Sequence, residues 1–171
     1  MSHDPAWLNA LPADAAEDEF LKCCGSRRWA REMADGRPYE TLEAVVANAT
    51  DVWWLLQPRD WLEAFRSHPK IGEKKTAGPV SMQAQKWSSQ EQAGVAEASR
   101  ETGEELALLN RTYEQKFGFI FIICATGKTS EEMLSALRER LDHDAEVELR
   151  IAAAEQNKIT ELRLRKLLQA T

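Results

Sequence analysis

Apolar residues recur every three or four positions along most of the chain, the spacing of one face of a helix. Turn signals at residues 25–26 and 36–38 divide the first part of this pattern. Ser26 and Thr41 follow these breaks and are suited to cap the helices that come next. We therefore expect helices near residues 16–24, 26–35 and 41–56.

Two prolines bound the next predicted helix. Pro58 fits its first turn, because a proline lacks only an N–H that has no partner there. The helix must end near His68, because Pro69 disfavours the α conformation in the residue before it. Residues 69–87 hold two glycines, two prolines and no clear period, and a loop of that length is usually functional or mobile.

The second half of the chain predicts more helices and one segment of another kind. We expect residues 88–116 to form one long helix, or two with a bend at Thr102-Gly103, and a last pair near 130–141 and 144–169. Residues 117–125 are β-branched and aromatic, which by propensity suggests a buried strand. No comparable run exists to pair with it. The segment is therefore either a helix of poor helix formers or an extended piece whose backbone groups are satisfied locally.

Composition narrows the classes of function. The 171 residues are close to the roughly 150 typical of one domain. The net charge of −6 argues against a generic nucleic-acid binder, and a small anionic substrate would need a local basic pocket. No uncharged apolar run reaches the roughly 18 residues that would suggest a membrane span. Three cysteines without metal spacing and an N-terminus without a secretory signal lead us to expect a cytoplasmic protein.

Metal and nucleotide chemistry have little local support. His3, His68 and His143 are scattered, and the chain holds no H-E-x-x-H, C-x-x-C, dinucleotide or phosphate-loop pattern. We therefore expect no metal site and no nucleotide cofactor.

The stretch Ser88-Ser89-Gln90-Glu91-Gln92 has two interpretations. A helix would place Ser88, Glu91 and Gln92 on one face. Ser88-x-x-Glu91 is also a capping box, which would give Glu91 a structural role. The alternative box Ser89-x-x-Gln92 would free Glu91 in the first turn, where the helix dipole favours its anion.

His68 and Arg163 are two further candidates. A lone histidine is more often a surface or core residue than a catalyst, but a helix C-terminus favours the imidazolium, which a general acid requires. Arg163 is either a solvated charge or, in register near Ile159 and Leu162, reaches inward to a carboxylate.

Several motifs occur in a specific order. They are Trp61-Leu62-x-Ala64-Phe65, His68-Pro69-x-Ile71-Gly72, Ser88-x-x-Glu91-Gln92, Asn110-x-x-Tyr113-x-x-Lys116-Phe117-Gly118, Phe121-Ile122-Ile123-Cys124-Ala125 and Arg163-Leu164. With these motifs the chain resembles, from about residue 16 to 168, the decarboxylases of 2-oxo-4-hydroxy-4-carboxy-5-ureidoimidazoline (OHCU), which form (S)-allantoin from a urate product.

The resemblance implies an all-α, single-domain multi-helix bundle over residues 1–171 that needs no cofactor and is frequently a homodimer. Residues 69–87 would be an active-site loop, residues 118–125 a buried extended segment, and residues 1–14 a loosely ordered N-terminal segment. His68 would be the catalytic proton donor, with Glu91 and Arg163 as its acidic and basic partners. The substrate-binding residues would be Pro69, Ser88, Ser89, Gln90, Gln92, Phe121, Ile122, Ile123, Cys124 and Ala125.

Two other functions compete with this hypothesis. A non-catalytic helical interaction module would use the motif residues only for capping and packing, and would have no pocket. A related lyase or hydrolase would act on another ureido or imidazoline compound, since pocket chemistry alone does not select OHCU.

Overall fold

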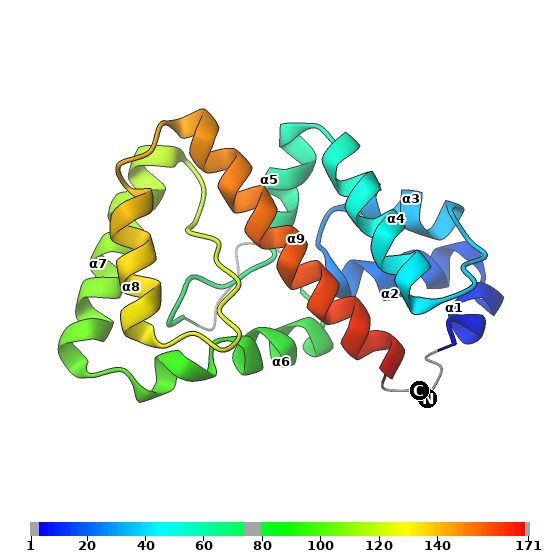
Figure 1. Ribbon diagram of the computed structural model, residues 1–171, viewed down its shortest axis with the longest axis horizontal. Coiled ribbons are helices and arrows are strands. Elements are labelled where there is room, and N and C mark those ends of the chain that lie inside the picture. Colours follow the sequence, from blue (N-terminus) through cyan, green and yellow to red (C-terminus); the bar gives the residue numbers. More distant parts are fainter. Residues whose placement is uncertain (1–3, 74–79, 170–171) are drawn as a thin grey trace. The chain divides into compact units, whose positions relative to one another are not determined.

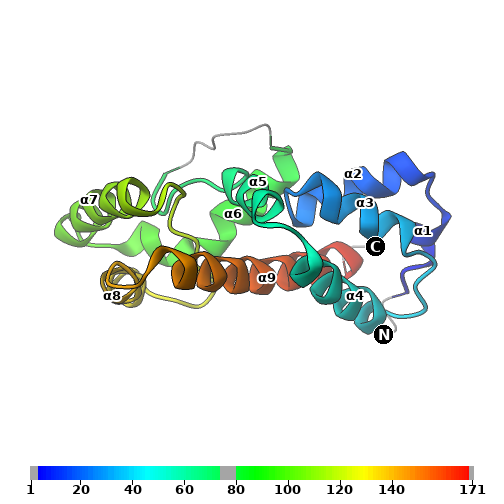
Figure 2. The ribbon, with the colours of Figure 1, turned by 90° about the horizontal axis from the view of Figure 1, so that it is seen from above.

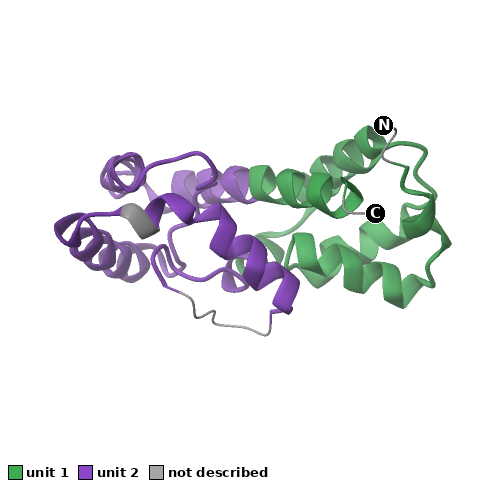
Figure 3. Cartoon of the chain, turned by 90° about the horizontal axis from the view of Figure 1, so that it is seen from below, with its two compact units in different colours: residues 1–64, 157–171 green, residues 65–156 purple. Residues whose placement is uncertain are grey.

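The computed structural model describes residues 4–73 and 80–169, without the side chains of residues 96 and 97 (Figure 1). Every regular element in these ranges is a helix, so the predicted all-α class is confirmed. The chain divides into two compact units, residues 1–64 with 157–171 and residues 65–156 (Figure 3). That residues 1–171 act as a single domain stays a prediction.

The first unit contains the N-terminal helices. They are α1 (Ala6–Ala10), α2 (Ala13–Cys23), α3 (Arg27–Asp35), α4 (Leu42–Leu55) and most of α5 (Pro58–Arg66). The predicted helices are confirmed here, and so are the two caps. The Ser26 hydroxyl accepts a hydrogen bond from the Trp29 amide, and the Thr41 hydroxyl accepts one from the Ala44 amide. Helix α1 was not expected, because residues 1–14 were predicted to be loosely ordered. Its Leu8 is buried, which gives this short helix an apolar anchor.

Aromatic side chains build the core of the first unit. Trp29 and Phe20 pack edge to face with ring centroids 5.9 Å apart. The Trp29 indole donates to the Ala49 carbonyl at 3.1 Å, and the Trp61 indole donates to the Trp53 carbonyl at 3.0 Å. The N–H of each buried indole therefore has a hydrogen-bond acceptor, and the two bonds join α3 to α4 and α4 to α5.

The second unit contains α6 (Met82–Glu91), η1 (Ala93–Glu97), α7 (Arg100–Phe117), α8 (Ser130–Arg140) and the first part of α9 (Ala145–Gln169). The two last predicted helices are confirmed. The predicted loop 69–87 is wrong over its last six residues, because α6 begins at Met82 with Ser81 as its cap. The part of that loop at residues 74–79 lies outside the described residues. The break after α6 falls before Arg100, where Ser99 caps α7, and not at Thr102-Gly103.

Helices α7 and α8 pack against each other and enclose the apolar core of this unit (Figures 1 and 2). The core includes Leu106 and Tyr113 of α7, Met133 and Leu137 of α8, and side chains of the segment between them. Helix α7 ends at Phe117, and its C-cap is Gly118, whose φ of +78° suits a residue without a Cβ. The chain then runs extended and buried from Phe121 to Ala125. Of the two interpretations of this stretch, the extended one is confirmed.

Candidate active site

A tight turn after α5 presents His68. Both His68 and Pro69 are buried, and the His68 amide donates to the Phe65 carbonyl at 3.2 Å. Gly72 then turns the chain with a φ of +86°, and its amide donates to the Gln92 side-chain oxygen at 2.9 Å. The Phe65 ring lies 5.5 Å from that of Phe119, at the start of the extended segment. The turn that carries His68 is therefore fixed against the segment and against the end of α6.

The imidazole of His68 is held by Gln156. Its Nε2 lies 2.6 Å from the Oε1 of Gln156, a side chain on α9 that is 0% exposed. An amide oxygen can only accept, so this contact makes Nε2 the donor and assigns it the proton. A histidine held in this way is a candidate general acid.

Helix α6 ends with two buried polar residues, Ser88 and Glu91. They lie on its inner face with Ala84 and Trp87, as expected for positions three and four apart. Both capping interpretations are wrong, because Ser88 and Glu91 lie in the last turn of α6 and Ser81 is its cap. The helix dipole therefore does not favour the Glu91 anion. Ser89 and Gln90 are exposed, and Gln92 is half-buried.

The extended segment presents alternate residues to opposite sides. Phe121, Ile123 and Ala125 belong to the apolar core between α7 and α8, as the two-residue period of an extended chain requires. The amide of Cys124 donates to the Oε2 of Glu155 on α9 at 3.4 Å. This backbone thus finds a side-chain partner on α9 in place of a neighbouring strand.

The thiol of Cys124 is buried and is influenced by nearby carboxylates. Burial raises its pKa, and the carboxylates of Glu155 and Glu91 add to the rise, since they disfavour a second negative charge. The thiol therefore stays protonated at neutral pH and is no thiolate nucleophile there.

Arg163 lies in the first unit, on the last part of α9, and is 2% exposed. Arg163 is therefore buried and is not a solvated charge, whereas its pairing with a carboxylate stays a prediction. Cys23 and Cys24 are also buried in this unit, and burial raises the pKa of both thiols while the positive charge of Arg163 lowers it. The effect of burial is larger than that of Arg163, and the pKa of Cys24 is about 11. Both thiols are therefore neutral at physiological pH.

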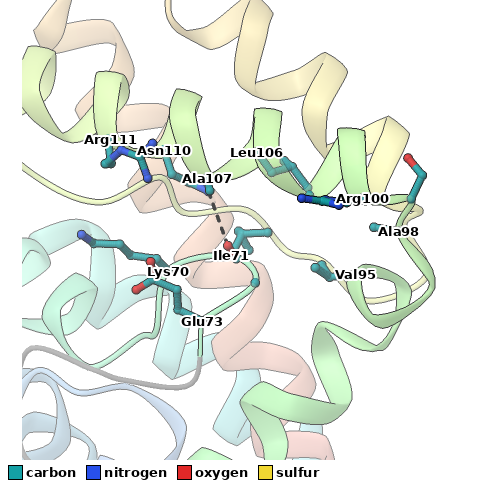
Figure 4. A pocket seen from close by; sticks show the side chains of 13 residues that line it. Lys70, Ile71, Glu73, Val95, Ala98, Arg100, Leu106, Ala107, Asn110 and Arg111 are labelled. Carbon is teal, nitrogen blue, oxygen red and sulfur yellow. Dashed lines mark hydrogen bonds between the residues drawn. The ribbon is translucent and has the colours of Figure 1, made fainter.

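A cavity of about 310 Å³ borders the turn that follows Pro69. Lys70, Ile71 and Gly72 form one side, and Leu106 and Asn110 of α7 form another (Figure 4). The Nδ2 of Asn110 donates to the Ile71 carbonyl at 3.5 Å. None of the predicted site residues lines this cavity, so its shape does not define the candidate site.

Neither a metal cluster nor a membrane span is found in the described ranges. No three His, Cys, Asp or Glu side chains there are grouped to hold a metal ion. No helix described for this chain is both long and apolar enough to cross a bilayer.

Comparison with known proteins decides the family. The sequence model described as OHCU decarboxylase matches residues 9–165. The chain belongs to the OHCU decarboxylase family. A crystal structure of OHCU decarboxylase in the presence of (S)-allantoin is 43% identical, with a TM-score of 0.77, over 89% of this chain and 98% of that one.

Other relatives, some of them longer, are also similar to this member of the OHCU decarboxylase family. The uric acid degradation bifunctional protein TTL of Arabidopsis thaliana is 45% identical over 92% of this chain, which spans 48% of that protein. The OHCU decarboxylase of Haloferax volcanii is 27% identical over 92% of this chain and 91% of its own length. The chain therefore spans less than half the length of several relatives that it matches.

In this member of the OHCU decarboxylase family, two residues that the sequence did not single out contact candidate site residues. Gln156 falls within the last predicted helix but was not a candidate, yet it binds the His68 imidazole. Arg140 was expected only within a helix, yet its guanidinium binds the Ile122 carbonyl. The one signal in the sequence that could have identified them is their polar character at positions on a buried helix face, because a buried polar side chain requires a hydrogen-bond partner.

Proposed function

We propose that this chain decarboxylates OHCU to (S)-allantoin in the degradation of urate, and that His68 protonates the intermediate on one face. The observation that carries the proposal is the buried imidazole of His68, with Nε2 held as a donor by Gln156 at 2.6 Å. The family supports the substrate, a small anionic molecule.

The reaction needs an electron acceptor and a proton. When the C–C bond to the carboxylate at C4 breaks, CO₂ leaves and the electron pair moves into the adjacent ring C=N bond of the substrate. The proton of the 4-hydroxyl then passes to that nitrogen, which leaves an enolate oxygen at C4. The resulting enolate takes one proton at carbon from the His68 imidazolium, which solvent then reprotonates. Because the substrate itself delocalises the electron pair, the proposed mechanism uses no cofactor. Protonation from one side gives one enantiomer.

Other residues would bind and orient the substrate. We assign Glu91 to orient His68 or the ureido group, and Arg163 to pair with the substrate's anionic groups. The Cys124 amide donates to Glu155, and successive amides of an extended chain point to opposite sides. The amides of Ile123 and Ala125 are therefore the proposed donors to the oxygen at C4 as its negative charge grows. Pro69, the residues from Ser88 to Gln92, and the backbone from Phe121 to Ala125 would line the site.

Assembly and location belong to the same proposal. We propose a homodimer, on the strength of the family resemblance, and expect sedimentation to report twice the mass of 19.4 kDa. Cys23, Cys24 and Cys124 are all free, which supports a reducing compartment, the cytoplasm.

The test follows the handedness of the product. The unstable substrate is generated in situ from urate, the protein is added with a chelator present, and the circular dichroism of the allantoin is recorded. We expect one enantiomer from the wild type. His68→Ala should lower the rate by about 10²–10⁴, the usual contribution of a general acid. The control Arg66→Ala, at an exposed position of the same helix end, should not change it.

Two outcomes would contradict the proposal. A wild-type protein that leaves the product racemic at the uncatalysed rate is no OHCU decarboxylase. A His68→Ala variant with wild-type turnover and a single enantiomer shows that another group donates the proton. Analysis of the product by mass separates this reaction from that of a lyase or hydrolase on another ureido compound.

A further inference from the structure

A buried polar network joins α7, α8 and α9 of the second unit. The Nε of Arg140 and the hydroxyl of Tyr113 both donate to Oε1 of Glu148, each at 2.5 Å. The Nη1 of Arg140 donates to the Ile122 carbonyl at 2.6 Å. The guanidinium therefore contacts the carboxylate through Nε and Nη2 and the extended segment through Nη1.

Removing the charges of Arg140 and Glu148 from water costs free energy. Glu148 is 0% exposed and Arg140 is 6% exposed, so both charges have left water. Apolar residues of similar volume often stabilise a core as well as a buried ion pair does, so stability alone does not explain the pair. The guanidinium makes a contact that an apolar side chain would not, because it donates to a backbone carbonyl.

The contact falls in the middle of the proposed substrate-binding segment. Arg140 also lies over the Phe121 ring, 4.5 Å from its centroid, so it holds two consecutive residues. The segment forms no strand, and the side chain of Arg140 supplies the donor that a neighbouring strand would otherwise give to Ile122.

We infer that Arg140, held by Glu148 and Tyr113, is a positioning residue for decarboxylation. Arg140 fixes the carbonyl of Ile122, which belongs to the same peptide group as the amide of Ile123. It thereby sets the direction of the Ile123 amide and, two residues further on, of the Ala125 amide, so that both point toward the negative charge that develops on the substrate. This inference rests on the proposed function. It adds three residues, none of which touches the substrate, to those that determine the rate.

A positioning role and a structural role predict different kinetics. If the network only stabilises the fold, any variant that regains stability should regain activity. If the network aims the amides, a variant without the bond to Ile122 should stay slow at full stability. A small misplacement of groups that bind the transition state lowers kcat strongly, whereas substrate binding is less affected.

The experiment compares two variants with one control. Arg140→Met with Glu148→Gln removes both charges together and leaves an acceptor for the Tyr113 hydroxyl. Arg140→Lys keeps the charge beside Glu148 but lacks the planar fork that reaches two acceptors. The control Arg138→Met lies on the same helix and removes an exposed guanidinium that pairs with Glu105. Melting temperature, kcat and KM are measured for each with OHCU generated in situ.

We expect the double variant to melt within a few degrees of the wild type and to lose about 10–100-fold in kcat, with a smaller change in KM. Arg140→Lys should lose about tenfold in kcat, and Arg138→Met should match the wild type. Wild-type kcat in either Arg140 variant would overturn the inference, and so would an equal loss in Arg138→Met. An inactive wild type would instead reject the proposed function.

Discussion

Replacing Gln156 by glutamate tests the role of His68 with almost no change in shape. The variant puts a carboxylate oxygen where the amide oxygen lies, 2.6 Å from Nε2 of His68. Because the site is buried, water screens the new charge only weakly. An opposite charge at that distance favours the imidazolium and raises the pKa of His68.

The size of the rise follows from the distance. Two delocalised charges with centres about 4 Å apart attract by about 4 kcal/mol at an effective dielectric constant of 20. Burial of the new carboxylate opposes part of this gain, and measured shifts for such pairs are about 1–3 pKa units. We therefore expect the pKa of His68 to rise by about 1–3 units in Gln156→Glu.

The assay is the pH dependence of kcat/KM, which reports the ionisations of the free enzyme. If His68 is the general acid, activity falls at high pH as it loses its proton. Gln156→Glu should move this fall upward by about 1–3 pH units. It should also lower the plateau rate, since a proton that is held more strongly is transferred more slowly.

Two controls accompany this variant. Gln115→Glu adds the same charge at an exposed position of α7 and should leave the profile in place. Gln156→Leu removes the acceptor without a charge and should cost about 1–3 kcal/mol in unfolding free energy, because the buried donor of His68 loses its partner. A folded Gln156→Glu protein whose profile matches that of the wild type would refute the reasoning.

Four other predictions concern stability. Gly103→Ala should raise the unfolding free energy by about 0.5–1 kcal/mol, because nothing lies within 4 Å of the new methyl and α7 gains a better helix former. Gly118→Ala should lower it by about 1 kcal/mol, because the space is equally open but φ is +78°; urea melts of both variants check the opposite signs. Ser81→Ala should cost about 1 kcal/mol through loss of the α6 cap, also measured by urea melts. Burial raises the pKa of the Cys24 thiol from 9.0 to about 11, so the unfolded chain loses this proton at lower pH than the folded protein does. The resulting stability should be constant below pH 9 and should fall as the pH rises through 11, by about 3 kcal/mol in all. Cys24→Ala should show a smaller fall over that range in denaturant titrations, and an unchanged slope would contradict the assignment.

The sequence by itself determined the helices and several of their ends. Ser26 and Thr41 were identified as caps because a hydroxyl and the amide it binds lie within one turn of chain. His68 was placed at a helix terminus because Pro69 acts on the residue directly before it. The ordered motifs also led to the family, which the match over residues 9–165 confirms.

The beginning of α6 shows where local signals were ambiguous. Ser81 and Ser88 both precede helix-compatible residues, and the capping-box spacing favoured Ser88. The structure begins the helix at Met82, and its apolar face, with Ala84 and Trp87, is buried. Burial of that face outweighs the capping pattern, since a buried tryptophan contributes more free energy than a capping hydrogen bond.

Only the tertiary structure decided which polar groups meet. His68 and Gln156 are 88 residues apart in the chain, and Arg140 and Ile122 are 18 apart. The burial of Glu91 at the end of α6 depends in the same way on packing beyond its own turn. Local propensity acts over one helical turn, whereas these contacts form only when separate elements pack and each buried donor must find an acceptor.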